Sequence, residues 1–153
     1  ALASEKPDWA VLGVDASEAA LTVARRNAAE LQQGEVQFLH SNWYDGLPPR
    51  QFNLLISNPP YIEPGDAHLS QGDVRFEPRS ALQAQDAGFA DLRTLIEGAP
   101  AHLGNEAYLL LEHGFEQGAR VRELLQQRGF TTVESRSDLA GHERVTGGRW
   151  HAE

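Results

Sequence analysis

The chain has 153 residues, and 41% of them are hydrophobic, which suits one domain with a single packed core. It contains no cysteine and no apolar run of membrane-spanning length, and its first residues do not resemble a signal peptide, which together fit a cytoplasmic protein. The formal net charge of -9 argues against broad, salt-driven binding to nucleic-acid phosphates, so we expect no direct nucleic-acid partner.

The N-terminal stretch "ALAS" is typical of the last turn of a helix. The chain has no methionine at its start or anywhere else. We therefore expect residues 1–153 to be part of a longer protein.

The first part of the chain alternates apolar runs with helical periodicity. Apolar runs predict three strands, at 9–14, 36–40 and 52–57. After the first run, Asp15 and Ser17 offer N-cap chemistry for a helix over 17–33. Gly34 is a suitable stop for this helix. Its apolar face comprises Leu21, Ala24, Ala28 and Leu31.

The second part begins with residues 61–87, which contain several glycines and prolines and show little periodicity. They predict a long ordered loop, and such loops within compact domains are usually functional. Helices are predicted over 88–103 and 115–129, and the first of them places Leu92, Leu95, Ile96 and Leu103 on one side. Strands are predicted at 106–114, 130–136 and 143–150. The short spacing of the last two predicts an antiparallel pair.

This alternation predicts an α/β fold with a doubly wound, mostly parallel sheet and an antiparallel C-terminal strand pair. In such sheets, ligands bind beyond the carboxyl ends of the strands. The residues that this rule selects are Asp15, Asn42, Trp43, Asn58, Glu112 and His113.

Three of these candidates have an ordinary interpretation beside the functional one. An acidic residue at the position of Asp15 binds ribose hydroxyls in nucleotide-binding folds, but a helix-capping Asp is equally common. Asn42 and Trp43 could hold a planar heterocycle by its edge and face, although a Trp near a strand end more often belongs to the core. No second metal-ligating residue stands at a suitable spacing from His113, so we interpret it as structural and predict no metal site.

The sharpest signal is Asn58-Pro59-Pro60-Tyr61, directly after the strand 52–57. Two prolines hold a loop rigid and leave neighbouring carbonyls outside a strand ladder. An asparagine offers both a donor and an acceptor, and a tyrosine offers a flat face. This combination suits a planar amino or amide nitrogen.

The tetrapeptide resembles the (Asn/Asp)-Pro-Pro-(Tyr/Phe) motif of S-adenosylmethionine-dependent methyltransferases that modify planar nitrogens. The longer stretch "SNPPYIEPGDAHLSQGDVRFEPRSAL", with "LLLEHG" and "ERVTGGRW" downstream, resembles the release-factor glutamine methyltransferases, the PrmC (HemK) family. The resemblance covers essentially the whole chain, and its "QGDVRFEP" part is more specific than the tetrapeptide. It implies a Rossmann-like class I methyltransferase fold, whose first strand and glycine-rich loop are expected before Ala1.

The family resemblance implies a role for each candidate residue. Residues 1–153 would form an N-terminally incomplete catalytic domain, inactive by itself, that uses S-adenosylmethionine as its cofactor. Asp15 would bind the ribose hydroxyls of the cofactor, and Trp43 would line its adenine pocket. Asn42 stands where the family usually has Asp, so its contact with adenine would be altered. Asn58 would lie near both the cofactor and the substrate.

The implied reaction methylates the side-chain amide nitrogen (N5) of the glutamine in the Gly-Gly-Gln motif of peptide chain release factors. Catalysis would depend on Asn58, Pro59 and Tyr61. The Asn58 side-chain oxygen and the Pro59 carbonyl would accept the two amide N–H groups and favour positive charge on the nitrogen. Tyr61 would stack on the amide, and Pro60 would complete the substrate-binding loop.

Three alternatives stay open at this point. An adenine-N6 nucleic-acid methyltransferase would share the tetrapeptide, although the chain is acidic and has no basic stripe. A ribosomal-protein glutamine methyltransferase would share the tetrapeptide but differ in the following loop. A non-catalytic binding domain of the same fold would lack the glycine-rich cofactor loop.

Overall fold

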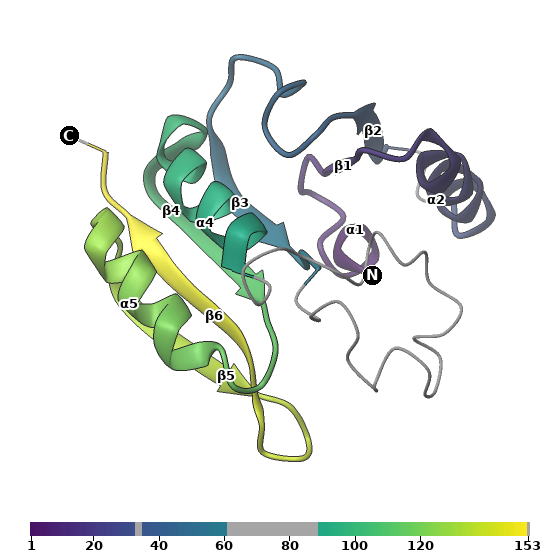
Figure 1. Ribbon diagram of the computed structural model, residues 1–153. Coiled ribbons are helices and arrows are strands. Elements are labelled where there is room, and N and C mark those ends of the chain that lie inside the picture. Colours follow the sequence, from purple (N-terminus) through teal and green to yellow (C-terminus); the bar gives the residue numbers. More distant parts are fainter. Residues whose placement is uncertain (33–34, 61–88, 153) are drawn as a thin grey trace. The chain divides into compact units, whose positions relative to one another are not determined.

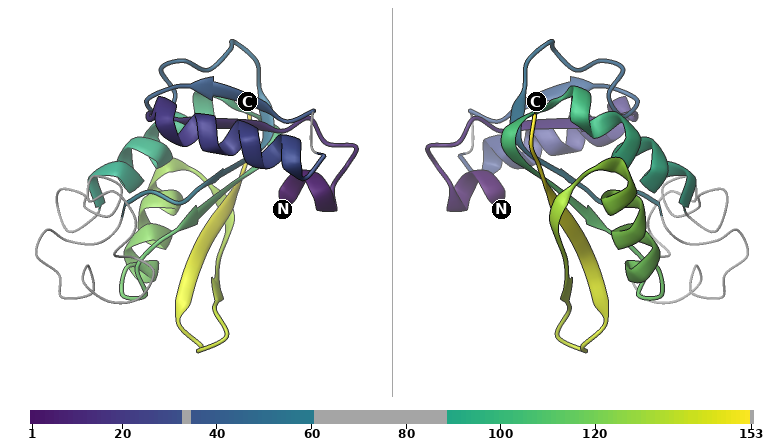
Figure 2. Two further views of the ribbon diagram at one scale, coloured as in Figure 1. Left: turned by 90° about the vertical axis from the view of Figure 1, so that its right-hand side faces the viewer. Right: turned by 90° about the vertical axis from the view of Figure 1, so that its left-hand side faces the viewer.

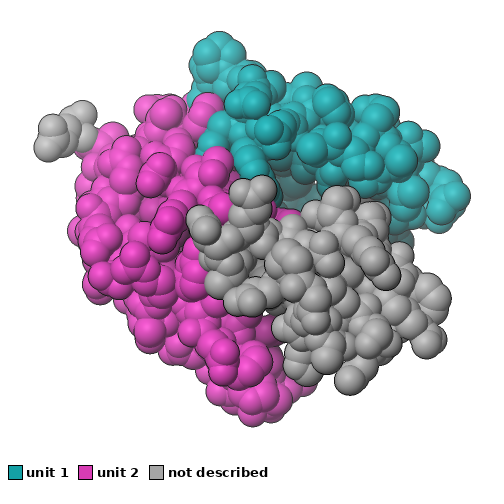
Figure 3. Space-filling model, in the orientation of Figure 1, with its two compact units in different colours: residues 1–50 teal, residues 51–153 magenta. Residues whose placement is uncertain are grey.

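The structure is a computed structural model that describes residues 1–32, 35–60 and 89–152. These residues form two compact units, Ala1–Arg50 as unit 1 and Gln51–Glu153 as unit 2 (Figure 3). The predicted loop 61–87, Tyr61 and Gly34 lie outside the described residues.

Unit 1 contains two parallel strands joined by a long helix (Figure 1). Its elements are α1 Leu2–Glu5, β1 Leu12–Asp15, α2 Glu18–Glu30 and β2 Gln37–His40. Asp15 is paired with His40 in the register of the two strands, so both strands end at the same level. The helix α2 provides the crossover connection that parallel strands need.

The start of α2 confirms the predicted N-cap, whereas its end differs from the prediction. The Ser17 side chain accepts a hydrogen bond from the Ala20 N–H at 3.2 Å. Leu21 is buried, as expected for the apolar face. Leu31 is 66% exposed, so its assignment to that face is wrong, because the helix ends at Glu30 and the backbone turns away there.

The first strand is shorter than the predicted run 9–14. The Trp9 N–H donates to the Lys6 carbonyl at 3.0 Å, and this turn occupies the residues before the strand. The strand therefore begins at Leu12.

Unit 2 contains a four-stranded sheet in the order β3-β4-β6-β5. Its strands are β3 Phe52–Ser57, β4 Leu103–Glu112, β5 Thr131–Ser137 and β6 Glu143–Trp150. β3 and β4 are parallel, while β6 is antiparallel to both β4 and β5. The predicted antiparallel C-terminal pair is therefore confirmed.

Two helices of unit 2, α4 Phe89–Gly98 and α5 Gly118–Arg128, lie side by side on one face of its sheet (Figures 1 and 2). The core between these layers consists of Leu92, Leu95, Ile96, Leu103, Leu109, Leu111, Val121, Leu125 and Phe130. Each large aliphatic side chain buried in this way contributes about 1.5–3 kcal/mol. Leu92, Leu95 and Ile96 are all buried on α4, which confirms the predicted apolar side for these three residues. Leu103 is also buried, but it belongs to β4, so its assignment to the helix is wrong.

The ends of these helices follow local chemistry. The helix predicted over 88–103 ends at Gly98, and a 3₁₀ turn over Ala99–Ala101, with Pro100 in it, leads into β4. The chain can therefore enter β4 earlier than the predicted strand 106–114. α5 ends at Arg128 and is capped by Gly129, whose φ of 101° is left-handed and whose N–H donates to the Gln126 carbonyl at 3.0 Å.

Among the helices of the described residues, none combines the length and the apolar character that crossing a membrane requires.

Candidate functional site

In unit 1, the carboxyl ends of β1 and β2 are tied together by one bond between backbone groups and one bond from the His40 side chain. The Ser41 N–H donates to the Asp15 carbonyl at 3.0 Å. The His40 ring nitrogen Nε2 lies 2.9 Å from the Ala16 carbonyl and donates to it, because a carbonyl can only accept. The chain segment that follows β1 is thereby held against the end of β2.

The side chain of Asp15 is exposed at this end. Its Oδ1 accepts a hydrogen bond from the Ser17 N–H at 2.7 Å, which fixes the entry into α2. The capping and the ligand-binding interpretations are therefore compatible, because a carboxylate can accept several hydrogen bonds at once.

Trp43 follows β2 in a tight turn closed by a hydrogen bond from the Asp45 N–H to the Asn42 carbonyl at 3.1 Å. The φ of Trp43 is 50°, in the left-handed region that costs a non-glycine residue about 1–2 kcal/mol. Its side chain is half-buried, and Asn42 beside it is exposed. The structure thus gives Trp43 a strained backbone at a strand end, a condition that often accompanies function.

Ser41 is a residue of this region that the sequence analysis missed. It is only 4% exposed, and its hydroxyl bonds to the backbone on both sides of the turn. A serine after a strand is common, so nothing in the sequence alone marks it. Nearby, burial raises the pKa of Tyr44 well above its ordinary value.

In unit 2, Asn58 follows the last residue of β3. Ser57 is paired with Leu111 in the parallel register, so Asn58 lies level with Glu112 at the carboxyl edge of the sheet. The Asn58 side chain is exposed, whereas Pro59 is fully buried. The buried ring of Pro59 restrains the backbone directly after Asn58, while the Asn58 side chain stays exposed.

His113 follows β4 at the same edge and is completely buried. Its Nδ1 lies 2.8 Å from the Gly114 carbonyl, and its Nε2 lies 2.7 Å from the Thr146 hydroxyl. Both ring nitrogens therefore have partners within the fold, which supports the structural interpretation of this residue.

A chain of side-chain hydrogen bonds continues from His113 across the sheet. The Thr146 hydroxyl on β6 lies 2.7 Å from the Ser135 hydroxyl on β5. Arg122 on α5 donates to Ser135 at 2.5 Å and to the Glu143 carboxylate at 2.7 and 2.8 Å. Side chains from the three elements that follow β4 along the chain, α5, β5 and β6, thus support its carboxyl end.

The groups at the two ends of this hydrogen-bond series, the Gly114 carbonyl and the Arg122 guanidinium, determine which atom donates in each bond. The Gly114 carbonyl can only accept, so His113 carries its proton on Nδ1, and Nε2 accepts from Thr146. Ser135 then donates to Thr146 and accepts from Arg122, whose nitrogens can only donate.

The neutral form of His113 suits this arrangement. Burial lowers the pKa of His113 most strongly, and the nearby Arg144 and Arg122 charges act in the same direction. The hydrogen bond to Gly114 and the charge of Glu143 oppose these effects. Among the described residues, no group of three or more His, Asp or Glu side chains is arranged to hold a metal ion.

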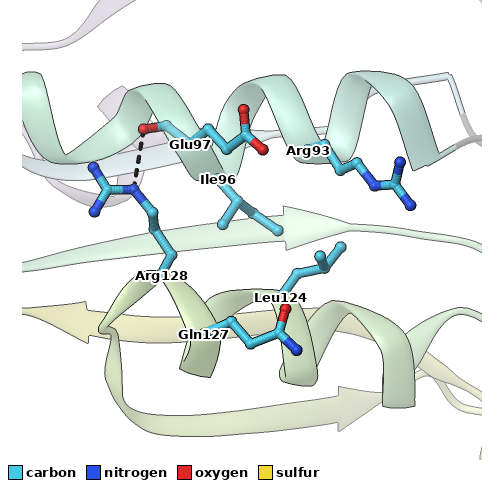
Figure 4. A pocket seen from close by; sticks show the side chains of 6 residues that line it. All are labelled: Arg93, Ile96, Glu97, Leu124, Gln127 and Arg128. Atoms are coloured by element: carbon cyan, nitrogen blue, oxygen red, sulfur yellow. Dashed lines mark hydrogen bonds between the residues drawn. The ribbon is translucent and has the colours of Figure 1, made fainter.

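A hollow of about 200 Å³ lies between α4 and α5, away from the strand ends (Figure 4). Its lining comprises Arg93, Ile96, Glu97, Leu124, Gln127 and Arg128. The Arg128 Nε donates to the Glu97 carbonyl at 3.3 Å across it. Ligand pockets usually measure about 300–1,000 Å³, and this hollow contains no strand-end candidate, so we do not consider it the functional site.

Comparison of the amino-acid sequence with known proteins shows which proteins this chain is similar to. A family model described as "Methyltransferase small domain" matches residues 1–76. The release factor glutamine methyltransferase of Pseudomonas aeruginosa is 51% identical over 149 residues, which cover 97% of this chain and 54% of that protein. That of Escherichia coli K12 is 45% identical over 151 residues, which cover 99% and 54%. The chain spans about half the length of the curated relatives it matches.

Solved structures show the fold. A methyltransferase from Pyrococcus furiosus matches with a TM-score of 0.72 at 16% identity, covering 99% of this chain and 68% of the other. A release factor-specific protein-(glutamine-N5) methyltransferase from Alicyclobacillus acidocaldarius matches with a TM-score of 0.51 at 22% identity, covering 93% and 80%.

The predicted fold class is therefore confirmed: the chain has the Rossmann-like fold of class I methyltransferases. Within that class, its sequence places it in the family of release factor glutamine methyltransferases, to which the chain belongs.

Proposed function

We propose that the protein carrying these residues transfers a methyl group from S-adenosylmethionine to the N5 atom of the glutamine in the Gly-Gly-Gln motif of peptide chain release factors. The observation that carries this proposal is the exposed side-chain amide of Asn58, which directly precedes the buried Pro59 at the carboxyl end of β3. The 51% identity to a release factor glutamine methyltransferase supports the substrate class.

The residues of unit 1 fit the nucleoside part of the proposed cofactor. The exposed carboxylate of Asp15 can accept hydrogen bonds from the two ribose hydroxyls, because its Oδ1 has only one partner among the described residues. The half-buried indole of Trp43 offers a face to adenine, and the exposed Asn42 offers polar groups to its edge. When bound, S-adenosylmethionine would supply an electrophilic methyl group on a sulfonium.

The residues of unit 2 fit the substrate amide. An amide nitrogen is a poor nucleophile because its lone pair is delocalised into the carbonyl. If the Asn58 side-chain oxygen and the Pro59 carbonyl accept its two N–H groups, they orient the nitrogen and stabilise the positive charge that develops on it. No strong base is then required, since the proton can leave after the methyl group has arrived.

The remaining proposed roles concern the rest of the tetrapeptide. Pro60 is half-buried and keeps the substrate loop stiff after Pro59. Tyr61, which lies outside the described residues, is proposed to stack on the amide and exclude water.

The test is methyl transfer from labelled S-adenosylmethionine to a purified release factor by the complete protein. We expect incorporation into the intact release factor and none into a variant whose Gly-Gly-Gln glutamine is replaced by alanine. Labelling of that variant would contradict the proposed acceptor. Preferential labelling of adenine-containing DNA or of a ribosomal protein would replace the proposal by one of the alternatives.

We also propose a cytoplasmic location and no direct nucleic-acid partner. Release factors are cytoplasmic substrates by their role in translation, and the net charge of -9 disfavours binding to phosphate backbones.

A further inference from the structure

We propose that Ser41 is a positioning residue for nucleoside recognition, which holds Trp43 in the orientation that an adenine ring would meet and ties the Trp43 turn to Asp15. This inference rests on the proposed function, because it assigns a task to a residue that supports the proposed cofactor-binding side chains. Ser41 itself is not proposed to touch the cofactor, since it is only 4% exposed.

Both hydrogen-bonding directions of the Ser41 hydroxyl are used. It donates to the Trp43 carbonyl at 2.8 Å and accepts from the Gly46 N–H at 2.9 Å. A carbonyl can only accept and an N–H can only donate, so the orientation of this hydroxyl is determined. One buried side chain thus connects the two sides of the turn that contains Trp43.

The conformation of Trp43 needs such support. Its φ of 50° occupies the first central position of the turn Asn42–Asp45, a position that glycine favours when φ is positive. A bulky residue keeps this conformation only where its surroundings determine it. The bond from Ser41 to the carbonyl of Trp43 itself acts directly on the strained residue.

The turn also lies very close to the end of β2. A Cβ atom built on Gly46 would approach the His40 carbonyl to 2.9 Å and the Ser41 side chain to 3.2 Å. The Gly46 N–H can therefore reach the Ser41 hydroxyl only because no side chain stands between the two backbones.

The backbone of Ser41 completes the connection to the other cofactor candidate. Its N–H donates to the Asp15 carbonyl at 3.0 Å, so Ser41 bonds to Asp15 through its main chain and to Trp43 through its side chain. The proposed ribose-binding and adenine-binding residues are thereby linked through a single buried residue.

The first experiment measures the turn without any ligand. Ser41→Ala leaves the Gly46 N–H without its acceptor, so amide hydrogen exchange at Gly46 should accelerate, and the fluorescence emission of Trp43 should change. Ser17→Ala is the matched control, because it also removes a hydroxyl that accepts from a backbone N–H in unit 1 but lies outside the turn. Unchanged exchange at Gly46 in Ser41→Ala would overturn the inference.

The second experiment separates cofactor binding from chemistry in the complete protein. With S-adenosylmethionine as the titrant, Ser41→Ala should raise Kd by about tenfold, while kcat at saturating cofactor and KM for the release factor stay within about twofold. Ser41→Cys keeps a weak donor and acceptor, so it should give a smaller rise, and it replaces the alanine variant if that variant does not fold.

The outcomes distinguish this inference from the proposed function. Wild-type affinity in Ser41→Ala, or an equal rise of Kd in Ser17→Ala, would overturn the positioning role and leave the proposed function intact. A fall in kcat as large as the rise in Kd would also overturn it. A wild-type protein that fails to bind S-adenosylmethionine would overturn both.

Discussion

The carboxyl ends of the strands are held in different ways in the two units. In unit 1, main-chain groups of Asp15, Ala16 and Trp43 are bonded, and the side chains of Asp15 and Trp43 stay at least partly exposed. In unit 2, the end of β4 is held by a chain of side chains that begins with a completely buried histidine.

The difference has a chemical consequence. In unit 1, the bonds from His40 and Ser41 reach main-chain groups and leave the side chains of Asp15 and Trp43 available to a ligand. In unit 2, the bonds of His113 use its side chain in the fold. In unit 2, the exposed Asn58 follows β3 at the same edge of the sheet where the buried His113 follows β4. We therefore expect substitutions of exposed strand-end residues to affect activity and substitutions of the buried chain to affect stability.

The largest expected effect is on turnover, from Asn58→Ala in the complete protein. The variant loses the proposed acceptor of the substrate amide, and removing one such oriented group costs about 10²–10³ in kcat. Asn53→Ala is the matched control, because Asn53 is also an exposed asparagine and lies within β3, the strand that Asn58 follows. Methyl transfer to a release factor measures both variants.

Asn58→Asp sharpens this result, since it keeps an acceptor but loses the amide donor and adds a charge. If acceptance of the substrate N–H groups is what matters, its activity should exceed that of Asn58→Ala. Near-wild-type turnover in Asn58→Ala, with the fold verified by circular dichroism, would show that the tetrapeptide is a structural turn.

Thr146→Val should have the largest effect on stability. It preserves shape but leaves His113 Nε2 without a donor and Ser135 without its acceptor, and a buried unsatisfied group costs about 1–3 kcal/mol. Thr131→Val removes an exposed hydroxyl from the same sheet and should change the free energy of unfolding by less than about 0.5 kcal/mol. Urea denaturation compares the two, and equal losses would contradict the buried chain as the support of β4.

The neutral state of His113 predicts how stability depends on pH. Burial lowers the pKa of His113 in the folded chain. Below a pH of about 6.5, His113 therefore binds a proton in the unfolded chain but not in the folded chain. The free energy of unfolding should therefore fall as pH decreases below about 6.5, by up to about 1.4 kcal/mol per pH unit, until the folded pKa is reached. His113→Gln should reduce this slope.

The tautomer of His113 provides an independent check. Nitrogen-15 NMR of labelled histidines at neutral pH should show the proton on Nδ1, because that atom faces a carbonyl. A signal from the Nε2–H tautomer would reverse the direction of the hydrogen bonds that we assign to Thr146 and Ser135.

Apart from the control variants, the smallest expected effect is that of Ser17→Ala in unit 1. Its hydroxyl accepts one hydrogen bond from the exposed start of α2, and loss of such a cap costs about 1 kcal/mol. Thermal unfolding measures the change. A loss larger than that of Thr146→Val would invert the comparison between the two units.

Much of the secondary structure could be predicted from local patterns. Apolar runs indicated the strands, and Ser17 and Gly129 marked a helix start and a helix end. The errors lie where local bonds override periodicity, as at the turn before Leu12 and at Pro100 after α4. The exposure of Asn58 and the burial of Pro59 agree with the predicted site, while its proposed role stays a prediction.

The sequence by itself determined the alternation of strands and helices, the strand-end candidates and the family, because these depend on neighbouring residues and on short motifs. Only the tertiary structure decided how the strand ends are held. Thr146 bonds to His113, Ser135 to Thr146 and Arg122 to Ser135, and these residues come from separate elements. The hydroxyl of Ser41 bonds to the backbone of the turn that follows it. Periodicity carries no information about such partners, because hydrogen bonds between distant residues exist only once the chain has folded.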